Sequence, residues 1–226
     1  MRPALLASFC VLVAACESDL TVSPSTVEWM EWPAEVPVAT PFMVRMLVSR
    51  PGCSQGVYKP GASADQSAVT FAPYFLVKDK PQICPLEALQ RDIYYVDLDT
   101  VGTAPGLAAN YVRTFEMRAS SSVYGPERLT AADVDVPLRT YGEVTVRLND
   151  PDSPESTTRN AGGFANKFVD NGCVQLRPAG GLGWSYVLED QADTSGLAYA
   201  FVRGYVHDVV TPVCGQTRVF ELLSRN

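Results

Sequence analysis

The sequence contains a single histidine, His207, so any histidine-dependent chemistry must use this residue. Cys214 follows a few residues later, and a cysteine nucleophile with a histidine base needs a thiolate and a third group that orients the imidazole. Asp208 is adjacent to His207, but neighbouring residues of a strand point to opposite faces. No Gly-x-Ser-x-Gly elbow surrounds any serine. We therefore expect no catalytic residue, a protein that is not an enzyme, and a histidine at the surface or rim of a sheet.

Carboxylates occur in pairs, which is the arrangement that glycoside hydrolysis uses. Asp97 and Asp99 share one face of an expected strand, and Asp133 and Asp135 repeat the spacing. Nothing in the sequence indicates the separation or the raised pKa that a glycosidase needs. The pairs are therefore interpreted as solvated strand faces or strand ends.

Metal-ligand patterns are weak in this sequence. An acidic loop offers calcium the oxygen atoms of Asp150, Asp152 and Glu155, but it lacks the order and the central glycine of an EF-hand. A zinc site would need closely spaced Cys or His residues, and no Cys-x-x-Cys pair is present. The glycine-rich run 180–183 joins two expected strands, which favours a turn over a phosphate-binding loop. We therefore expect no metal ion and no cofactor.

Aromatic residues and net charge limit the classes of partner. Trp29, Trp32 and Trp184, with several tyrosines, allow a stacking platform for a saccharide or a peptide, although most rings of a small β protein lie in its core. The net charge of −7 provides no basic surface for nucleic acid. Two alternatives stay open: a structural or interaction protein, with an envelope protein as its partner, and a saccharide- or peptide-binding protein.

The N-terminal segment has the parts of an export signal. Arg2 supplies a positive charge, residues 4–15 are apolar, and a polar run begins at Glu17. A helix of that length reaches about 18 Å, well short of the roughly 30 Å hydrocarbon core of a bilayer. The segment is therefore predicted to be a signal peptide rather than a transmembrane helix.

The end of this segment, Val13-Ala14-Ala15-Cys16, resembles the lipobox of bacterial lipoproteins. In that family the cysteine sulfur receives a diacylglyceryl group, and the signal is removed before the cysteine. The resemblance implies that residues 1–15 are cleaved, that acyl chains such as palmitate anchor Cys16 to the lipid bilayer, and that the protein resides in the bacterial cell envelope. Glu17, in place of Asp, favours the outer membrane, with the body in the periplasm or at the cell surface. An ordinary secretory signal cleaved after Ala15 remains the alternative.

The number of cysteines separates these two alternatives. Cys10 is lost with the signal, which leaves an odd number of cysteines in an exported chain. If Cys16 carries lipid, the cysteines that remain are Cys53, Cys84, Cys173 and Cys214. Four cysteines allow three pairings. Pairing of Cys53 with Cys84 and of Cys173 with Cys214 is favoured, because it closes the shorter loops in an oxidising compartment.

Short alternating apolar runs, broken by Gly, Pro, Asn and Asp, predict an all-β chain. After a lipidated tether at 16–25, residues 26–119 are expected to form an immunoglobulin-like sandwich. Its expected elements are an edge strand at 27–32, strands at 42–49, 68–78, 92–99 and 110–118, and a short helix at 85–91. Pro73 is expected to interrupt the strand at 68–78.

The second half is expected to be a separate small β-barrel. Residues 120–134 are interpreted as a linker and 135–226 as the barrel. Its expected strands are 141–148, 172–178, 184–189, 199–206 and 218–223, and the polar segment 149–167 is expected to be a long loop. Gly172-Cys173 and Cys214-Gly215 resemble the strand-opening and strand-closing positions of OB-like barrels in exported bacterial proteins.

Overall fold

The structure, a computed structural model, describes residues 20–38, 40–49, 56–59, 61–78, 89–96, 112–120, 137–147, 157–179, 184–192 and 197–225. These ranges consist mainly of β-strands, which confirms the predicted all-β class. Within them, no helix has the length and the hydropathy of a membrane span.

The strands are numbered along the chain. The first half contains β1 (Leu20–Pro24), β2 (Thr26–Pro33), β3 (Glu35–Pro37), β4 (Phe42–Ser49), β5 (Gly56–Lys59), β6 (Ala62–Ala64), β7 (Ala68–Phe71), β8 (Tyr74–Lys78), β9 (Leu89–Val96) and β10 (Val112–Ser120). The second half contains β11 (Leu138–Arg147), β12 (Arg159–Asp170), β13 (Cys173–Pro178), β14 (Tyr186–Val187), β15 (Leu197–Val213) and β16 (Gln216–Arg225).

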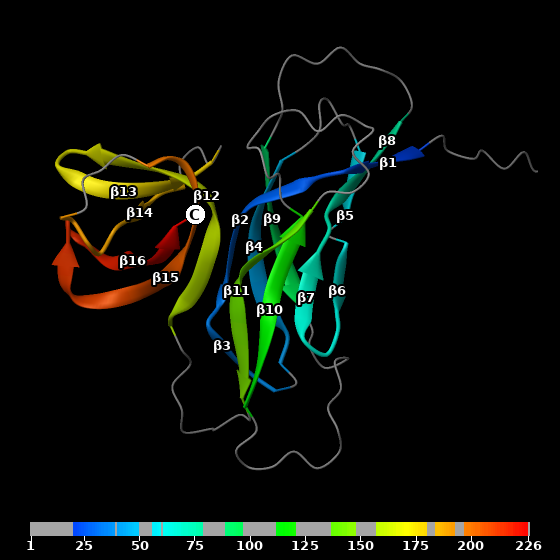
Figure 1. The fold of residues 1–226 in the computed structure, drawn as a ribbon, viewed down its shortest axis with the longest axis horizontal. Coiled ribbons are helices and arrows are strands. Elements are labelled where there is room, and N and C mark those ends of the chain that lie inside the picture. Colours follow the sequence, from blue (N-terminus) through cyan, green and yellow to red (C-terminus); the bar gives the residue numbers. More distant parts are fainter. Residues whose placement is uncertain are drawn as a thin grey trace, which may run out of the picture.

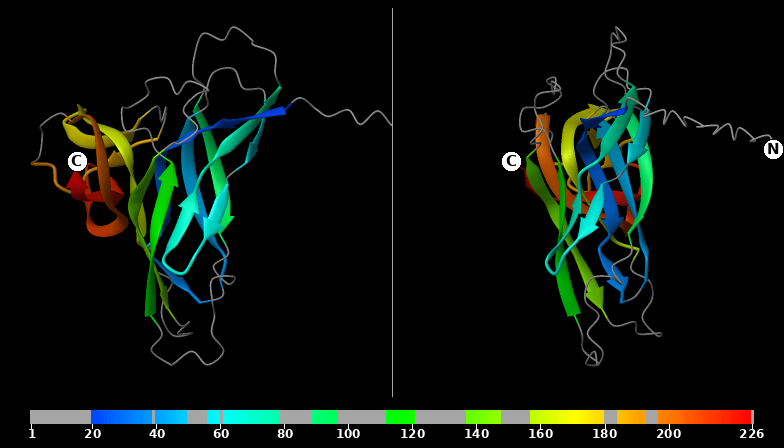
Figure 2. Two further views of the ribbon diagram at one scale, coloured as in Figure 1. Left: turned by 45° about the vertical axis from the view of Figure 1, so that its right-hand side comes forward. Right: turned by 90° about the vertical axis from the view of Figure 1, so that its right-hand side faces the viewer.

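The strands form three sheets. The smallest has the order β1-β8-β5, and a five-stranded sheet has the order β3-β11-β10-β7-β6. The largest has the order β14-β13-β12-β2-β4-β9, and β15, paired with β12, adds β16 to it. Figure 1 shows the five-stranded sheet in front of β2, β4 and β9, and β13–β16 on the other side of β12. The left view of Figure 2 shows the same division.

One hydrophobic core lies between the five-stranded sheet and strands β2 and β4. Strand β4 has the predicted bounds and alternation, and its core residues are Phe42, Val44, Met46 and Val48. From the facing sheet, Phe115 and Met117 of β10 are buried in the same core. Its largest rings have polar partners, because Trp32 Nε1 donates to the Glu143 carbonyl oxygen at 3.0 Å and the Tyr141 hydroxyl donates to the Val27 carbonyl oxygen. The core therefore joins strands from both sheets.

The strand predicted at 68–78 is interrupted as expected, since β7 ends before Pro73 and β8 begins after it. The helix predicted at 85–91 is wrong where the structure describes it, because Leu89–Arg91 belong to β9. The preceding residues of that helix and the linker residues 121–134 lie outside the described ranges.

The prediction that 27–32 is an edge strand is wrong. Strand β2 pairs with β12 on one side and with β4 on the other, so it is central. Both of its faces are buried, since Met30 and Trp32 pack in the first core and Trp29 packs in a second core on the opposite face. Pro33 ends the strand but does not place it at an edge, because the lost N–H falls at the last paired residue.

The prediction of a long loop at 149–167 is also wrong from Arg159 onward, where the twelve-residue strand β12 begins. Strand β12 pairs with β2 and then β13 along one edge and with β15 along the other. Gly163 allows the approach to β2, because a Cβ atom there would lie 2.1 Å from the Glu28 carbonyl oxygen. The strand shows no simple alternation, since residues on both of its faces are buried.

Strands β12–β16 form the half of the largest sheet that curls on itself, called here the curled half. Their pairing follows the cyclic order β12-β13-β14-β16-β15 and returns to β12. The last contact of this ring is a parallel bridge between Leu188 and Phe220, and the Glu189 N–H donates to the Phe220 carbonyl oxygen at 3.0 Å. The ring encloses the second core, which contains Val174, Leu176 and Phe220.

Two strands lie elsewhere than the expected domain ranges suggest. Strand β11, within the range expected for the barrel, pairs with β10 and β3 in the five-stranded sheet. Strand β1, within the range expected for the tether, pairs with β8 from Leu20 to Pro24. The pairings of β11 with β3 and of β1 with β8 bring together segments distant in sequence, so the local pattern does not specify them.

Candidate functional site

A largely buried polar network connects β2 to the curled half. The Tyr186 hydroxyl accepts hydrogen bonds from Trp184 Nε1 at 2.6 Å and from Trp29 Nε1 at 3.2 Å, and it donates to Glu31 Oε2 at 2.9 Å. Glu31 also forms an ion pair with the Arg159 guanidinium, while Arg45 lies 3.9 Å from Glu31 Oε1. Strands β2, β4, β12 and β14 therefore meet at one carboxylate.

Burial determines the charge states in this network. Burial, the negative charge of Glu31 and the hydrogen bond to it raise the pKa of Tyr186 well above its usual value, so Tyr186 stays a hydrogen-bond donor. Burial lowers the pKa of Arg159, and the ion pair with Glu31 opposes that shift. A protonated phenol and a paired carboxylate are poor general bases. The network instead joins β2, β12 and β14 through hydrogen-bonded and paired side chains.

A second buried carboxylate, Glu28, has a related environment. Tyr199 donates to Glu28 Oε2 at 3.2 Å, and Thr26 Oγ1 donates to Glu28 Oε1 at 3.3 Å. Burial and the charge of Glu28 raise the pKa of Tyr199. The Tyr199 ring stacks on Phe164 with centroids 4.9 Å apart. Tyr199, on β15, therefore contacts residues of both β2 and β12.

A groove of about 560 Å³ lies between β11 on one side and β12, β15 and β16 on the other. It is lined in part by the polar residues Thr140, Glu143, Asn160 and Arg203 and by Tyr205. Arg203 Nη2 donates to the Thr140 carbonyl oxygen at 2.6 Å, and Asn160 Nδ2 donates to the Glu143 carbonyl oxygen, so both side chains bridge the two walls. The groove therefore places hydrogen-bonding side chains beside the aromatic residue Tyr205.

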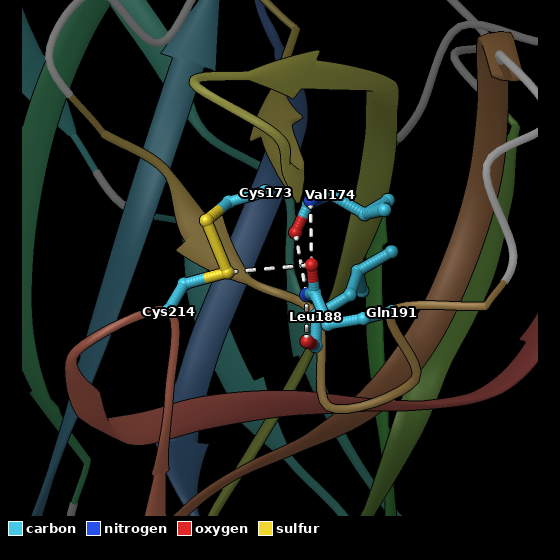
Figure 3. Close-up of a disulfide and its surroundings, with 5 residues drawn as sticks. All are labelled: Cys173, Val174, Leu188, Gln191 and Cys214. Atoms are coloured by element: carbon cyan, nitrogen blue, oxygen red, sulfur yellow. Dashed lines mark hydrogen bonds between the residues drawn. A yellow bond between two sulfur atoms is a disulfide. The ribbon is translucent and has the colours of Figure 1, made fainter.

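The second cysteine pair is joined as predicted. Cys173 and Cys214 form a disulfide with a Cα–Cα distance of 6.0 Å (Figure 3). Beside it, Gln191 accepts the Val174 N–H at 2.8 Å and donates to the Val174 and Leu188 carbonyl oxygens at 3.1 and 2.5 Å. A disulfide that closes a 41-residue separation contributes about 2–4 kcal/mol to stability. Because its sulfur is oxidised, Cys214 is not a nucleophile.

The structure describes some of the other residues that the sequence suggested as sites, and others lie outside the described ranges. Cys16, Cys53 and Cys84 lie outside the described residues, as do the carboxylate pairs at 97–99 and 133–135 and the acidic loop at 150–155. Trp29 and Trp32 are fully buried, so the binding platform that included them is wrong. Trp184 is half-buried and packs beside Tyr186, in the network rather than on an open surface.

His207 lies on the outer side of the curled half, with 23% of its side chain exposed. Its Nε2 atom is 3.2 Å from Glu189 Oε2 and 3.9 Å from Glu221 Oε2. Sequence reasoning did not bring these two glutamates to His207, because Glu189 follows β14 and Glu221 lies on β16. The register of β15 with β16, in which Tyr205 is opposite Glu221 and His207 opposite Val219, was the signal that could have identified one of them.

Comparison with known proteins finds no family model, no curated protein and no solved structure that matches this chain.

Proposed function

We propose that this protein is a lipoprotein of the bacterial cell envelope, anchored through an acylated Cys16, with a non-enzymatic structural or interaction role. The observation that carries the proposal is the run Val13-Ala14-Ala15-Cys16 after a short apolar segment. The disulfide between Cys173 and Cys214 supports it, because such bonds persist in oxidising compartments. Glu17 after the cysteine favours the outer membrane.

The short segment between Cys16 and the first strand would hold the folded body close to the membrane. Strand β1 begins at Leu20, so three residues separate it from Cys16. Consecutive Cα atoms are 3.8 Å apart, which limits the distance from Cys16 to Leu20 to about 15 Å. The three-stranded sheet that contains β1 would then stay near the bilayer surface, and two or three acyl chains would hold it there.

The pairing order of the curled half supports a finer proposal for the fold. A ring of five strands around a closed core is the architecture of a small OB-like barrel, and here β12 supplies the strand that sequence reasoning missed. The two facing sheets of the remaining body are proposed to be an immunoglobulin-like sandwich.

Replacement of Cys16 by alanine tests the anchor. In a bacterial host fed a labelled fatty acid, Cys16→Ala should abolish labelling and move the protein from the membrane fraction to the soluble fraction, because the acylated sulfur is gone. Cys10→Ala, within the same signal segment, is the matched control and should be labelled normally. Labelling of Cys16→Ala at the wild-type level would contradict the proposal.

The groove between β11 and the curled half favours a second candidate function, saccharide binding by the anchored body. Tyr205 offers a flat ring among hydrogen-bonding groups. Chitotriose and maltotriose are suitable neutral probes in isothermal titration calorimetry with the purified full chain. Tyr205→Ala should weaken binding about two- to tenfold, since an aromatic stacking contact contributes roughly 0.5–1.5 kcal/mol.

The control is Val210→Ala on the same strand, because Val210 is fully exposed and outside the groove. It should bind the trisaccharides as wild type does. No binding of either trisaccharide, or equal binding by Tyr205→Ala and wild type, would refute the saccharide candidate.

A further inference from the structure

Three side chains that can ligate a metal ion meet on the outer side of the curled half. Glu189 follows β14, His207 lies on β15 and Glu221 lies on β16. The β15–β16 register places His207 diagonally across from Glu221, and the hydrogen bond from the Glu189 N–H to the Phe220 carbonyl oxygen brings Glu189 beside Glu221. The last contact of the ring therefore assembles this cluster, which we call the Glu–His–Glu cluster.

The ligand atoms of the Glu–His–Glu cluster are close to one another. One atom from each residue lies within 4.8 Å of the others, and His207 Nε2 is 3.2 Å from Glu189 Oε2. Ligands about 2.1 Å from a metal ion, at tetrahedral or octahedral angles, lie roughly 3–3.5 Å apart. Small changes of exposed side-chain rotamers are enough to reach that geometry.

The charge of the cluster favours a cation. Among the described residues, His207 is the one basic side chain within ion-pair distance of Glu189 and Glu221, so two carboxylates share one imidazole. Arg218, the nearby arginine on β16, pairs instead with Asp208 at 3.5 Å. With a neutral imidazole the cluster has a charge of about −2, which a divalent ion would neutralise.

The donor set selects among cations. Calcium and magnesium prefer oxygen ligands alone, whereas an imidazole nitrogen with two carboxylates suits divalent manganese, iron or zinc. A cavity of about 240 Å³ borders both glutamates, and their side chains are 42% and 47% exposed, which leaves room for water ligands. We propose that Glu189, His207 and Glu221 bind one divalent first-row transition-metal ion, with its remaining positions open to solvent.

Manganese binding to the full chain tests this proposal. Mn²⁺ is the probe because it prefers oxygen and nitrogen to the thiols that Cys53 and Cys84 would offer if reduced. Electron paramagnetic resonance of free Mn²⁺ should lose intensity as the purified, untagged protein is added. Zn²⁺ should restore the free Mn²⁺ signal, because it binds the same donors more tightly.

Variants locate the ion. Glu189→Gln, His207→Gln and Glu221→Gln should each weaken Mn²⁺ binding at least about tenfold. Asp208→Asn is the matched control, since this carboxylate adjoins His207 but pairs with Arg218. Circular dichroism should show each of these surface variants folded. A free Mn²⁺ signal that wild type leaves unchanged, or equal binding by wild type and the Glu189→Gln/Glu221→Gln double variant, would overturn the proposal.

Discussion

Glu31→Ala should lower the free energy of unfolding by about 2–4 kcal/mol, because it leaves the Arg159 guanidinium, whose side chain is only 16% exposed, without its counter-charge. The same change removes the acceptor of the Tyr186 hydroxyl. Adding Arg159→Met to Glu31→Ala should recover part of the loss, since it removes the uncompensated charge. Urea denaturation followed by tryptophan fluorescence measures these differences.

The matched control is Glu35→Ala, at an ion pair of the same residue types on the surface. Glu35 lies 2.8 Å from Arg147, and both side chains are about half exposed. This change should cost at most about 1 kcal/mol, because solvent screens an exposed pair. Similar losses for Glu31→Ala and Glu35→Ala would show that the network between β2 and β14 does not hold the strands together.

Gly163→Ala should destabilise the fold by more than about 4 kcal/mol. The added Cβ would lie 2.1 Å from the Glu28 carbonyl oxygen and 2.7 Å from Trp29 Cα. Both atoms are backbone, so no side-chain rotation relieves the overlap, and φ at Gly163 is +146°. Strand β12 would have to separate from β2. Thermal unfolding by circular dichroism, or loss of soluble protein on expression, measures the effect.

Gly172→Ala separates this steric effect from backbone strain. Gly172 also has a positive φ, +81°, but no atom lies within 4 Å of the added Cβ. It should therefore cost only about 1–2 kcal/mol. If Gly163→Ala were as stable as Gly172→Ala, the close approach of β12 and β2 would not be required for folding.

The sequence was most informative where apolar residues alternate along a strand. Strand β4 has that spacing, so its bounds and its face in the first core were predicted correctly. Leu47, on its opposite face, is nevertheless buried in the second core. Strand β2 was placed at an edge because its run stops at Pro33. The run also contains two glutamates, Glu28 and Glu31. Both are buried against partners on distant strands, which a local pattern cannot show.

Strand β12 was missed for a related physical reason. Its segment Arg159–Asp170 contains adjacent glycines and few β-branched residues, both of which weaken a strand prediction. Gly162 and Gly163 are there because neighbouring backbone lies too close for a side chain. Close packing against neighbouring strands therefore requires glycines in β12, and the strand lacks the alternation of apolar and polar residues on which the prediction depended.

The candidate sites depended even more on long-range pairing. The pairing of Cys173 with Cys214 could be predicted, because the number and spacing of cysteines limit the alternatives. The Glu–His–Glu cluster could not, because Glu189 reaches it only through the parallel bridge between Leu188 and Phe220. The groove also escaped prediction, since β11, which forms one wall, was assigned to the barrel and lies instead in the five-stranded sheet.

Strand β12 carries ladder hydrogen bonds along both of its edges, to β2 and β13 on one and to β15 on the other. Bending the molecule between its halves would break the β2–β12 ladder and uncover the second core, so hinge motion is unfavourable. The walls of the groove are therefore preorganised, and a ligand would bind there without a closing movement. The shape of the groove, already formed in the free protein, would then determine which ligands fit.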